Sequence, residues 1–173
     1  MITCQAIEDA KTSGMLIPFV PAVPWASRPR AFLMTKRLDK EIKAGCASPD
    51  RKRYERWERL RADMAHYTEN GFVSWSFMKW LQPKKFEHWE LKSVRPRPSL
   101  RVFGRFARPN IFVGTHVVER SPLGAKWSLE WELEKLSCEE LWNEAFGGSD
   151  PFRSAIYEHY ITENASRDLG VPR

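Results

Sequence analysis

The stretch from residue 89 to residue 118 constrains the fold of this chain more than any other feature. Leu100 to Phe106 and Ile111 to Val118 are two apolar runs, and Ala107-Arg108-Pro109-Asn110 between them favours a turn. Two such runs joined by so short a connection indicate an antiparallel β-hairpin. Trp89 to Val94 is predicted to be a further strand, so this segment predicts the start of an antiparallel sheet.

A fourth strand is predicted downstream of the hairpin. Large apolar residues alternate with serine and glutamate at Trp127, Leu129, Trp131 and Leu133. Strict alternation is typical of a strand with one buried and one solvated face. The sequence therefore predicts an antiparallel meander of three to five strands, covered on one side.

The segments before the meander are predicted to supply helices. The prolines of IPFVPAVPW make an edge strand or extended arm the expectation for residues 1–28. Arg30 to Ala44 is predicted as a helix. A second helix follows Ser48-Pro49-Asp50, ends at Asn70-Gly71 and carries a buried aromatic stripe. Phe72 to Leu81 is expected to be a short helix or turn.

Two more helices are predicted after the meander. Ser137 and Glu140 form a capping box for a helix that ends at Gly147, and Pro151 to Asn164 is expected to form the last helix. The predicted class is α+β, with the antiparallel meander packed between N-terminal and C-terminal helices. Residues 1–173 are expected to form a single domain, because a chain of this length buries one core.

Charge is unevenly distributed along the chain. From Lys84 to Arg108 there are eight Lys and Arg residues against Glu87 and Glu90, an excess equal to the net charge of +6 of the whole chain. From Trp127 to Glu144 six glutamates face Lys135 alone. The basic stretch is the predicted anion-binding surface, and nucleic acid is the expected anion.

Several classes of site find no support in the sequence. Cys4, Cys46 and Cys138 are widely spaced, so neither a disulfide framework nor a cysteine zinc site is indicated. The histidines lack metal-ligand spacing, and no glycine-rich phosphate loop is present. No metal and no cofactor are expected. Because no apolar run approaches the roughly 20 residues that span a bilayer, a cytoplasmic protein without membrane contact is predicted.

A symmetric hairpin would place Arg101 opposite His116 on an open face of the sheet. Guanidinium groups there could donate hydrogen bonds to the phosphates of single-stranded RNA, and Phe103 or Phe112 could stack on a base. His116 could take a proton in metal-independent phosphodiester cleavage, with arginines stabilising the charge. The alternatives are a structural histidine and a solvated face, or a docking surface for an acidic protein.

The segment Trp89 to Gly124 resembles the central part of the RelE/HigB-like toxins of bacterial toxin–antitoxin systems. Glu90-Leu91-Lys92, Arg101-Val102-Phe103, and His116 with Arg120 stand where that family carries its Glu-Leu-Arg, Arg-aliphatic-aromatic and basic segments. The resemblance implies a small antiparallel sheet packed by N-terminal helices. It also implies cleavage of mRNA, free or on the ribosome, and inhibition by an antitoxin protein.

The expected site residues follow from the hairpin and the resemblance together. The catalytic candidates are Arg101, His116 and Arg120. The residues expected to contact RNA are Lys92, Arg95, Arg97, Arg105, Arg108, Phe103 and Phe112. The competing hypothesis is a non-catalytic adaptor, encoded by a phage or mobile element, that binds a nucleic acid or a protein. Steeply salt-dependent binding without cleavage would favour that binding module.

Overall fold

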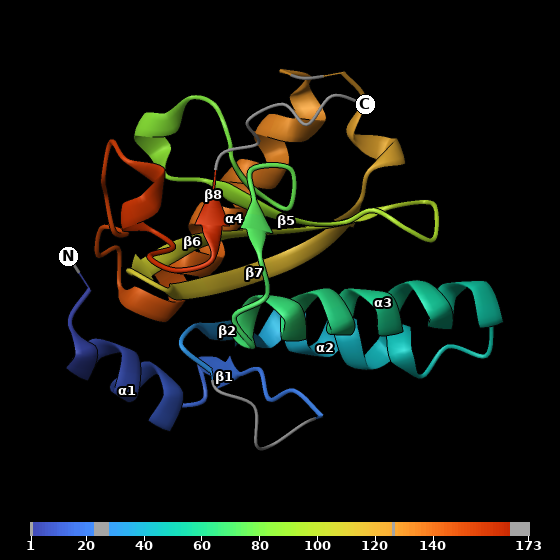
Figure 1. Ribbon diagram of the computed structural model, residues 1–173, viewed down its shortest axis with the longest axis horizontal. Helices are drawn as coiled ribbons and strands as arrows, with labels where there is room; N and C mark the ends of the chain where they lie inside the picture. The colour runs from blue at the N-terminus through green and yellow to red at the C-terminus, as the bar shows by residue number, and fades with distance from the viewer. Residues whose placement is uncertain (1, 23–27, 126, 167–173) are drawn as a thin grey trace.

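A six-stranded mixed sheet forms the centre of the computed structural model (Figure 1). The structure describes residues 2–22, 28–125 and 127–166. In spatial order the strands are β1 (Leu16–Pro18), β2 (Ala31–Thr35), β7 (Ile111–Glu119), β6 (Leu100–Arg108), β5 (Trp89–Ser93) and β4 (Met78–Trp80). The helices are α1 (Cys4–Thr12), α2 (Lys36–Cys46), α3 (Arg51–Thr68) and α4 (Leu129–Phe146). β3 (Val73–Ser74) and β8 (Ala165–Ser166) form a separate parallel pair.

The predicted hairpin and the α+β class are confirmed. β4, β5, β6 and β7 each run antiparallel to the next, so the meander has four strands. The expectation of a wholly antiparallel sheet is wrong, because β2 lies parallel to β7, with Ala31 opposite Ile111. The meander is therefore one part of a mixed sheet.

The register of the hairpin differs from the symmetric prediction. Phe103 lies opposite His116, and Arg101 lies opposite Val118. Irregularities after Phe103 and after Phe106 shift the pairing along the strands. A bulge adds an unpaired residue to one strand, which moves every later partner. Arg101 and His116 are therefore not direct cross-strand neighbours.

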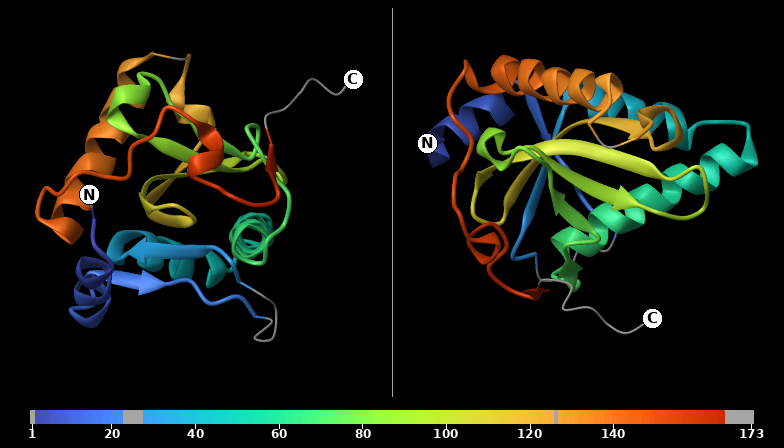
Figure 2. Two further views of the ribbon diagram at one scale, coloured as in Figure 1. Left: turned by 60° about the vertical axis from the view of Figure 1, so that its left-hand side comes forward. Right: turned by 90° about the horizontal axis from the view of Figure 1, so that it is seen from above.

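Both faces of the sheet are covered, not one as predicted. On one face α2 and α3 pack over a core that includes Trp57, Trp89 and Phe106. On the other face α4 contributes Trp131 and Cys138 to a cluster with Phe103, and Trp142 and Phe146 to a cluster with α1. The right-hand view of Figure 2 shows α4 and α3 on opposite sides of the strands.

The strand predicted from Trp127 to Leu133 is wrong, because this segment begins helix α4. One face of α4 buries Trp131, Lys135, Cys138, Trp142 and Phe146, which recur at three or four residues. Leu129 and Leu133 point to solvent instead. The alternating pattern arose because apolar residues lie on both faces of the helix. Ser137 and Glu140 consequently lie inside α4 and do not cap it, although the predicted end at Gly147 is confirmed.

Four other predicted segments also differ from the structure. The predicted arm contains helix α1 and the edge strand β1, while residues 1 and 23–27 lie outside the described residues. Residues 31–35, expected to be helical, form β2. Phe72 to Leu81, expected to be a short helix or turn, contains β3 and β4 joined by a turn at residues 75–77. The segment predicted as the last helix contains one 3₁₀ turn, Tyr157–His159, and inserts Tyr157, Tyr160 and Ile161 into the core.

Helices α2 and α3 begin where polar side chains satisfy their first amide groups. The Thr35 hydroxyl accepts a hydrogen bond from the Leu38 amide, and the Asp50 carboxylate accepts one from the Lys52 amide. The two helices approach closely at Gly45. A Cβ atom at Gly45 would lie 2.0 Å from the Trp57 ring, so the absence of a side chain permits this packing.

We expect Gly45→Ala to lower the free energy of unfolding by about 1–3 kcal/mol, the usual cost of overpacking. Alanine ordinarily stabilises a helix interior by about 1 kcal/mol relative to glycine, so the sign is the reverse of the propensity effect. Urea unfolding followed by circular dichroism measures the difference. Ala44→Gly, at the neighbouring exposed position, is the control and should cost about 1 kcal/mol. A stabilised Gly45→Ala protein would contradict the packing described.

Candidate functional site

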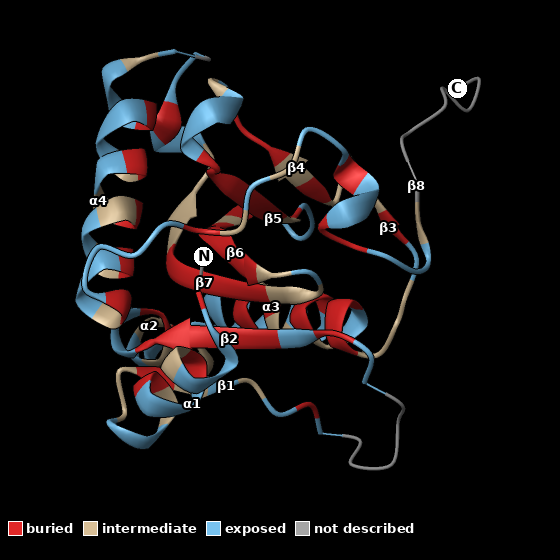
Figure 3. Ribbon diagram, turned by 90° about the vertical axis from the view of Figure 1, so that its left-hand side faces the viewer, coloured by how far each residue is buried: buried red, intermediate tan, exposed pale blue. Residues whose placement is uncertain are grey.

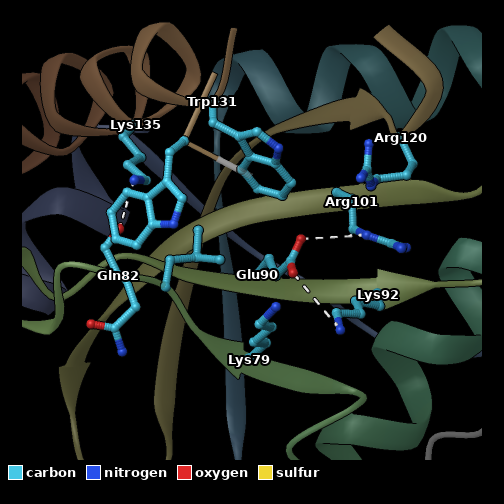
Figure 4. Close-up of a pocket in the computed structure, with 10 residues that line it drawn as sticks. Lys79, Gln82, Glu90, Lys92, Arg101, Arg120, Trp131 and Lys135 are labelled. Atoms are coloured by element: carbon cyan, nitrogen blue, oxygen red, sulfur yellow. Dashed lines mark hydrogen bonds and ion pairs between the residues drawn. The ribbon is translucent and has the colours of Figure 1, made fainter. Parts of the chain in front are cut away.

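A cavity of about 330 Å³ lies between the meander and the first turns of α4 (Figure 4). This is within the usual size of a site for a small ligand or a single nucleotide. β4, β5 and β6 form its floor, and α4 with the segment before it forms one wall. The lining residues are Lys79, Leu81, Gln82, Glu90, Lys92, Arg101, Arg120, Trp127, Trp131 and Lys135.

Strand pairing explains why the charged groups of the floor meet. Lys79 of β4 lies opposite Glu90 of β5, and Lys92 of β5 lies opposite Arg101 of β6. Side chains two residues apart on a strand share a face, and paired residues on neighbouring strands point to the same side. All four side chains therefore project toward the same side of the sheet. That side also carries Phe103, where α4 covers it.

Glu90 lies at the centre of the site and has almost no contact with solvent, with 3% of its side chain exposed. Its Oε2 lies 3.4 Å from Arg101 Nε, and its Oε1 lies 3.9 Å from Lys92 Nζ. Within the described part of the chain, Oε2 has no hydrogen-bond partner. Burial raises the pKa of this carboxyl group, and the opposing charges of Lys92, Arg101, Lys79 and Arg120 offset only part of that effect.

The wall of the cavity combines cations with indole rings. Lys135 is buried and donates hydrogen bonds to the Gln82 carbonyl at 2.6 Å and to Glu132 at 2.7 Å. Its ammonium lies 5.3 Å from the centre of the Trp127 ring, and the Arg120 guanidinium lies 5.7 Å from that of Trp131. Both distances are typical of cation–π contacts. The cavity thus brings five cationic side chains around one carboxylate.

The predicted exposure of His116 is wrong. His116 is completely buried, and its ring stacks on Phe103 with centroids 5.2 Å apart. Its Nε2 donates to Glu134 Oε2 at 2.9 Å, and Nδ1 lies 3.0 Å from the Thr115 hydroxyl. Helix α4 covers this face because Trp131 packs on Phe103. The imidazole therefore holds α4 in place and has no access to a ligand from solvent.

The other predicted residues divide into three groups. Lys92, Arg101 and Arg120 come together in the cavity. Arg95 and Arg97 are exposed on the loop between β5 and β6. The remaining four have structural contacts, and they are Phe103, Phe112, Arg105 and Arg108.

Three of those four side chains are buried, and the fourth, Arg108, is partly buried. Phe103 and Phe112 are fully buried on opposite faces of the sheet, so the prediction that they stack on bases is wrong. Arg105 is buried and donates to the Phe86 carbonyl at 2.8 Å, beside His88 and Glu139. Arg108 is partly buried and donates to the Ile2 carbonyl at 3.3 Å.

The buried group around Arg105 also contains His88. Burial, with the nearby charges of Arg105 and Lys135, lowers the pKa of His88 to about 3. The imidazole is therefore neutral at physiological pH, and its Nε2 lies 3.1 Å from Glu139. This cluster ties α4 to β6 beside the cavity.

Seven lining residues of the cavity were not predicted as site residues from the sequence: Lys79, Leu81, Gln82, Glu90, Trp127, Trp131 and Lys135. The two tryptophans were assigned to a strand, and Lys79 to a helix or turn. One signal was available, since Lys135 is the single cation among the glutamates of that segment. A lysine four residues after Trp131 on a helix shares its buried face, which indicates a position facing the sheet.

Comparisons with known proteins give no match to a family model, a curated protein or a solved structure. Within residues 2–22, 28–125 and 127–166, no three or more His, Cys, Asp or Glu side chains are grouped as metal ligands. Across the same residues, no helix combines the length and apolar character that crossing a bilayer requires.

The contact between His116 and Glu134 predicts a pH dependence of stability. Hydrogen bonding to His116 lowers the pKa of Glu134 below its usual range. A carboxyl group with a lowered folded-state pKa contributes stability above its unfolded-state pKa, and this stability is lost as pH falls through the folded-state pKa. We expect Glu134→Gln to be less stable than the original protein at pH 7.

The difference between the two proteins should shrink as the pH falls below about 4. Urea unfolding at pH 7 and at acid pH checks this expectation. Glu144→Gln, an exposed position on the same helix, is the control and should show no such pH-dependent difference. Equal stability of the Glu134→Gln variant and the original protein at pH 7 would contradict the role given to this pair.

Proposed function

We propose that the protein binds single-stranded RNA, with one nucleotide held in the cavity between the meander and α4. The observation that carries the proposal is the convergence of five cations and two tryptophans on one concave site. Cationic grooves that hold phosphates and aromatic rings that stack on bases are the usual parts of single-strand binding sites. The proposal agrees with the resemblance to the RelE/HigB-like toxins, whose activity is the cleavage of mRNA.

The charges of the cavity favour a phosphate group as the ligand. Arg101 and Arg120 can donate two parallel hydrogen bonds to phosphate oxygens, and Lys92 and Lys79 add positive charge. Glu90 lies beneath them, mostly out of reach of water. Because its single charge leaves the cavity with a positive excess, an anion gains attraction on entering.

The surroundings of the cavity favour a nucleic-acid strand over an isolated anion. Trp127 has 63% of its surface exposed and stands at the wall, where its ring is available for stacking. The exposed loop that follows β5 carries Arg95 and Arg97 and extends the positive surface away from the cavity. A strand held by its phosphate in the cavity would pass over this loop.

A second candidate function is metal-independent cleavage of the bound RNA, and the Glu90 oxygen that has no hydrogen-bond partner within the described residues favours it. A carboxylate with a raised pKa is a stronger base when it is ionised, and burial raises the pKa of Glu90. Glu90 would take the proton of the ribose 2′-hydroxyl. The 2′-oxygen would then attack phosphorus.

In the same reaction the bond from phosphorus to the 5′-oxygen breaks, and a lysine ammonium or water supplies the proton of the leaving group. The products are a 2′,3′-cyclic phosphate and a 5′-hydroxyl. Arg101 and Arg120 would stabilise the additional charge on phosphorus. This proposal replaces His116 with Glu90 as the base, because Glu90 lines the cavity and His116 does not.

We expect Arg101→Ala to weaken binding of a labelled single-stranded RNA by about tenfold or more, since a charge-assisted hydrogen bond contributes about 1.5–3 kcal/mol. The slope of log K against log salt should become less steep by about 0.7 for one lost phosphate contact. Fluorescence anisotropy over a range of salt concentrations measures both quantities.

Arg51→Ala is the matched control, because Arg51 is 90% exposed on α3 and pairs only locally with Glu55. It removes the same charge from the protein but should leave the affinity within about twofold. Equal losses in the two variants would show that net charge, and not the cavity, attracts RNA. Binding of an acidic protein with no affinity for RNA would favour the adaptor hypothesis.

Glu90 is proposed both to place a negative charge beside the phosphate and to act as the base. Its replacement by glutamine should therefore affect RNA affinity and the rate of cleavage in opposite directions. Glu90→Gln removes the negative charge from the cavity, so RNA should bind at least as tightly as before. Cleavage of labelled RNA in EDTA, with or without ribosomes, should fall by about 10² or more because the base is lost. Gel analysis with identification of the cyclic phosphate follows the reaction. RNA binding without cleavage by the unsubstituted protein would exclude the second candidate and leave the first.

A further inference from the structure

The outer face of α4 carries an apolar stripe that the rest of the described chain does not cover. Leu129, Leu133 and Leu136 have 70%, 52% and 55% of their surface exposed. The opposite face of the helix packs on the sheet through Trp131, Cys138 and other residues. Figure 3 shows the outer side of α4 as exposed or intermediate along its length.

The exposure of these leucines is concentrated rather than scattered. Four of the ten large apolar side chains exposed in the described structure lie between Trp127 and Leu136, the fourth being Trp127 itself. Single exposed leucines are ordinary on protein surfaces, whereas contiguous apolar patches mark sites of interaction. The apolar stripe therefore differs from an ordinary solvated helix face.

The spacing of the leucines indicates the shape of what covers them. Leu129, Leu133 and Leu136 are separated by four and then three residues, which is the spacing of a coiled-coil seam. In that arrangement Leu129 and Leu136 occupy d positions and Leu133 occupies an a position. A second helix lying along α4 covers such a seam by inserting its own apolar side chains between the leucines.

The charges beside the stripe indicate the chemistry of the partner. Glu130 and Glu132 occupy the positions next to the seam, and Glu140 and Glu144 continue the same face. Glu132 is partly neutralised by Lys135 at 2.7 Å, while Glu130 is fully exposed. Residues beside a seam select partners by charge, so lysine or arginine is required on the facing helix.

We propose that the outer face of α4 binds a basic amphipathic helix of a partner protein. The same charges disfavour two other occupants. A second copy of this chain would place acidic residues against acidic residues along the seam, and an anionic membrane surface would repel them. The proposal does not depend on RNA binding, because the cavity lies on the side of α4 that faces the sheet.

The test uses two synthetic helical peptides of about three heptads, with leucine at a and d and either lysine or glutamate at e and g. Fluorescence anisotropy measures their binding to the full chain. The lysine peptide should bind at least about tenfold more tightly than the glutamate peptide, which corresponds to about 1.4 kcal/mol. Failure of the lysine peptide to bind, or equal binding of both, would overturn the proposal.

Variants of the protein locate the binding site. Leu133→Ser combined with Leu136→Ser should weaken binding of the lysine peptide by about tenfold or more, and both positions are exposed, so the fold should persist. Val94→Ser, which removes a half-exposed apolar side chain from the loop between β5 and β6, is the control and should have no effect.

Circular dichroism confirms that each variant is folded. Unchanged affinity in the double leucine variant would show that the peptide binds elsewhere. Sedimentation of the original protein as a dimer that the double variant abolishes would show that the stripe is covered by a second copy. Either result would contradict the proposal.

Discussion

The packing of α4 against the sheet determines which side chains of this protein can meet a ligand. Trp131 and Cys138 seal Phe103 and the imidazole of His116 from solvent, and Glu134 anchors the helix to that imidazole. Where α4 begins, the same face of the sheet stays open, and there the charged residues of β4, β5 and β6 surround a cavity. The site is therefore what the helix leaves uncovered.

The cavity depends on a balance between the buried negative charge of Glu90 and the positive charges beside it. An isolated buried carboxylate is costly, and Glu90 is retained because Arg101 and Lys92 lie close enough to compensate it. The geometry of these contacts is loose, since 3.4 Å and 3.9 Å exceed ordinary hydrogen-bond lengths. Glu90 therefore holds the two cations near it by charge rather than by short hydrogen bonds.

The sequence allowed the central hairpin, the third helix and the charge asymmetry to be predicted, because each depends on local signals. The turn at Asn110 and the aromatic stripe of α3 are each determined by residues that are close together in the sequence. The register was not predicted, because counting outward from a symmetric turn takes no account of the irregularities after Phe103 and Phe106, which shift the pairing. α4 was misassigned because its two apolar faces hide the helical period.

The same limits explain the outcome for the site. Lys92, Arg101 and Arg120 were found because basic residues near a hairpin remain recognisable from the sequence. Lys79 and Lys135 reach the cavity only through pairing across strands and through the approach of α4, which are long-range contacts. The burial of His116 likewise depends on a helix that the sequence pattern presented as a strand.

The parallel pairing of β2 with β7 has a consequence for the order in which the chain can assemble. The hairpin of β6 and β7 joins neighbouring segments and closes a short loop. In contrast, β2 can pair with β7 only after that much later segment has been synthesised. Until β7 is present, β2 can pair only with β1, and its other backbone edge stays open. A nascent or truncated chain that ends before Ile111 would expose the unpaired backbone N–H and C=O groups of this strand edge. We expect such fragments to bind chaperones or to aggregate.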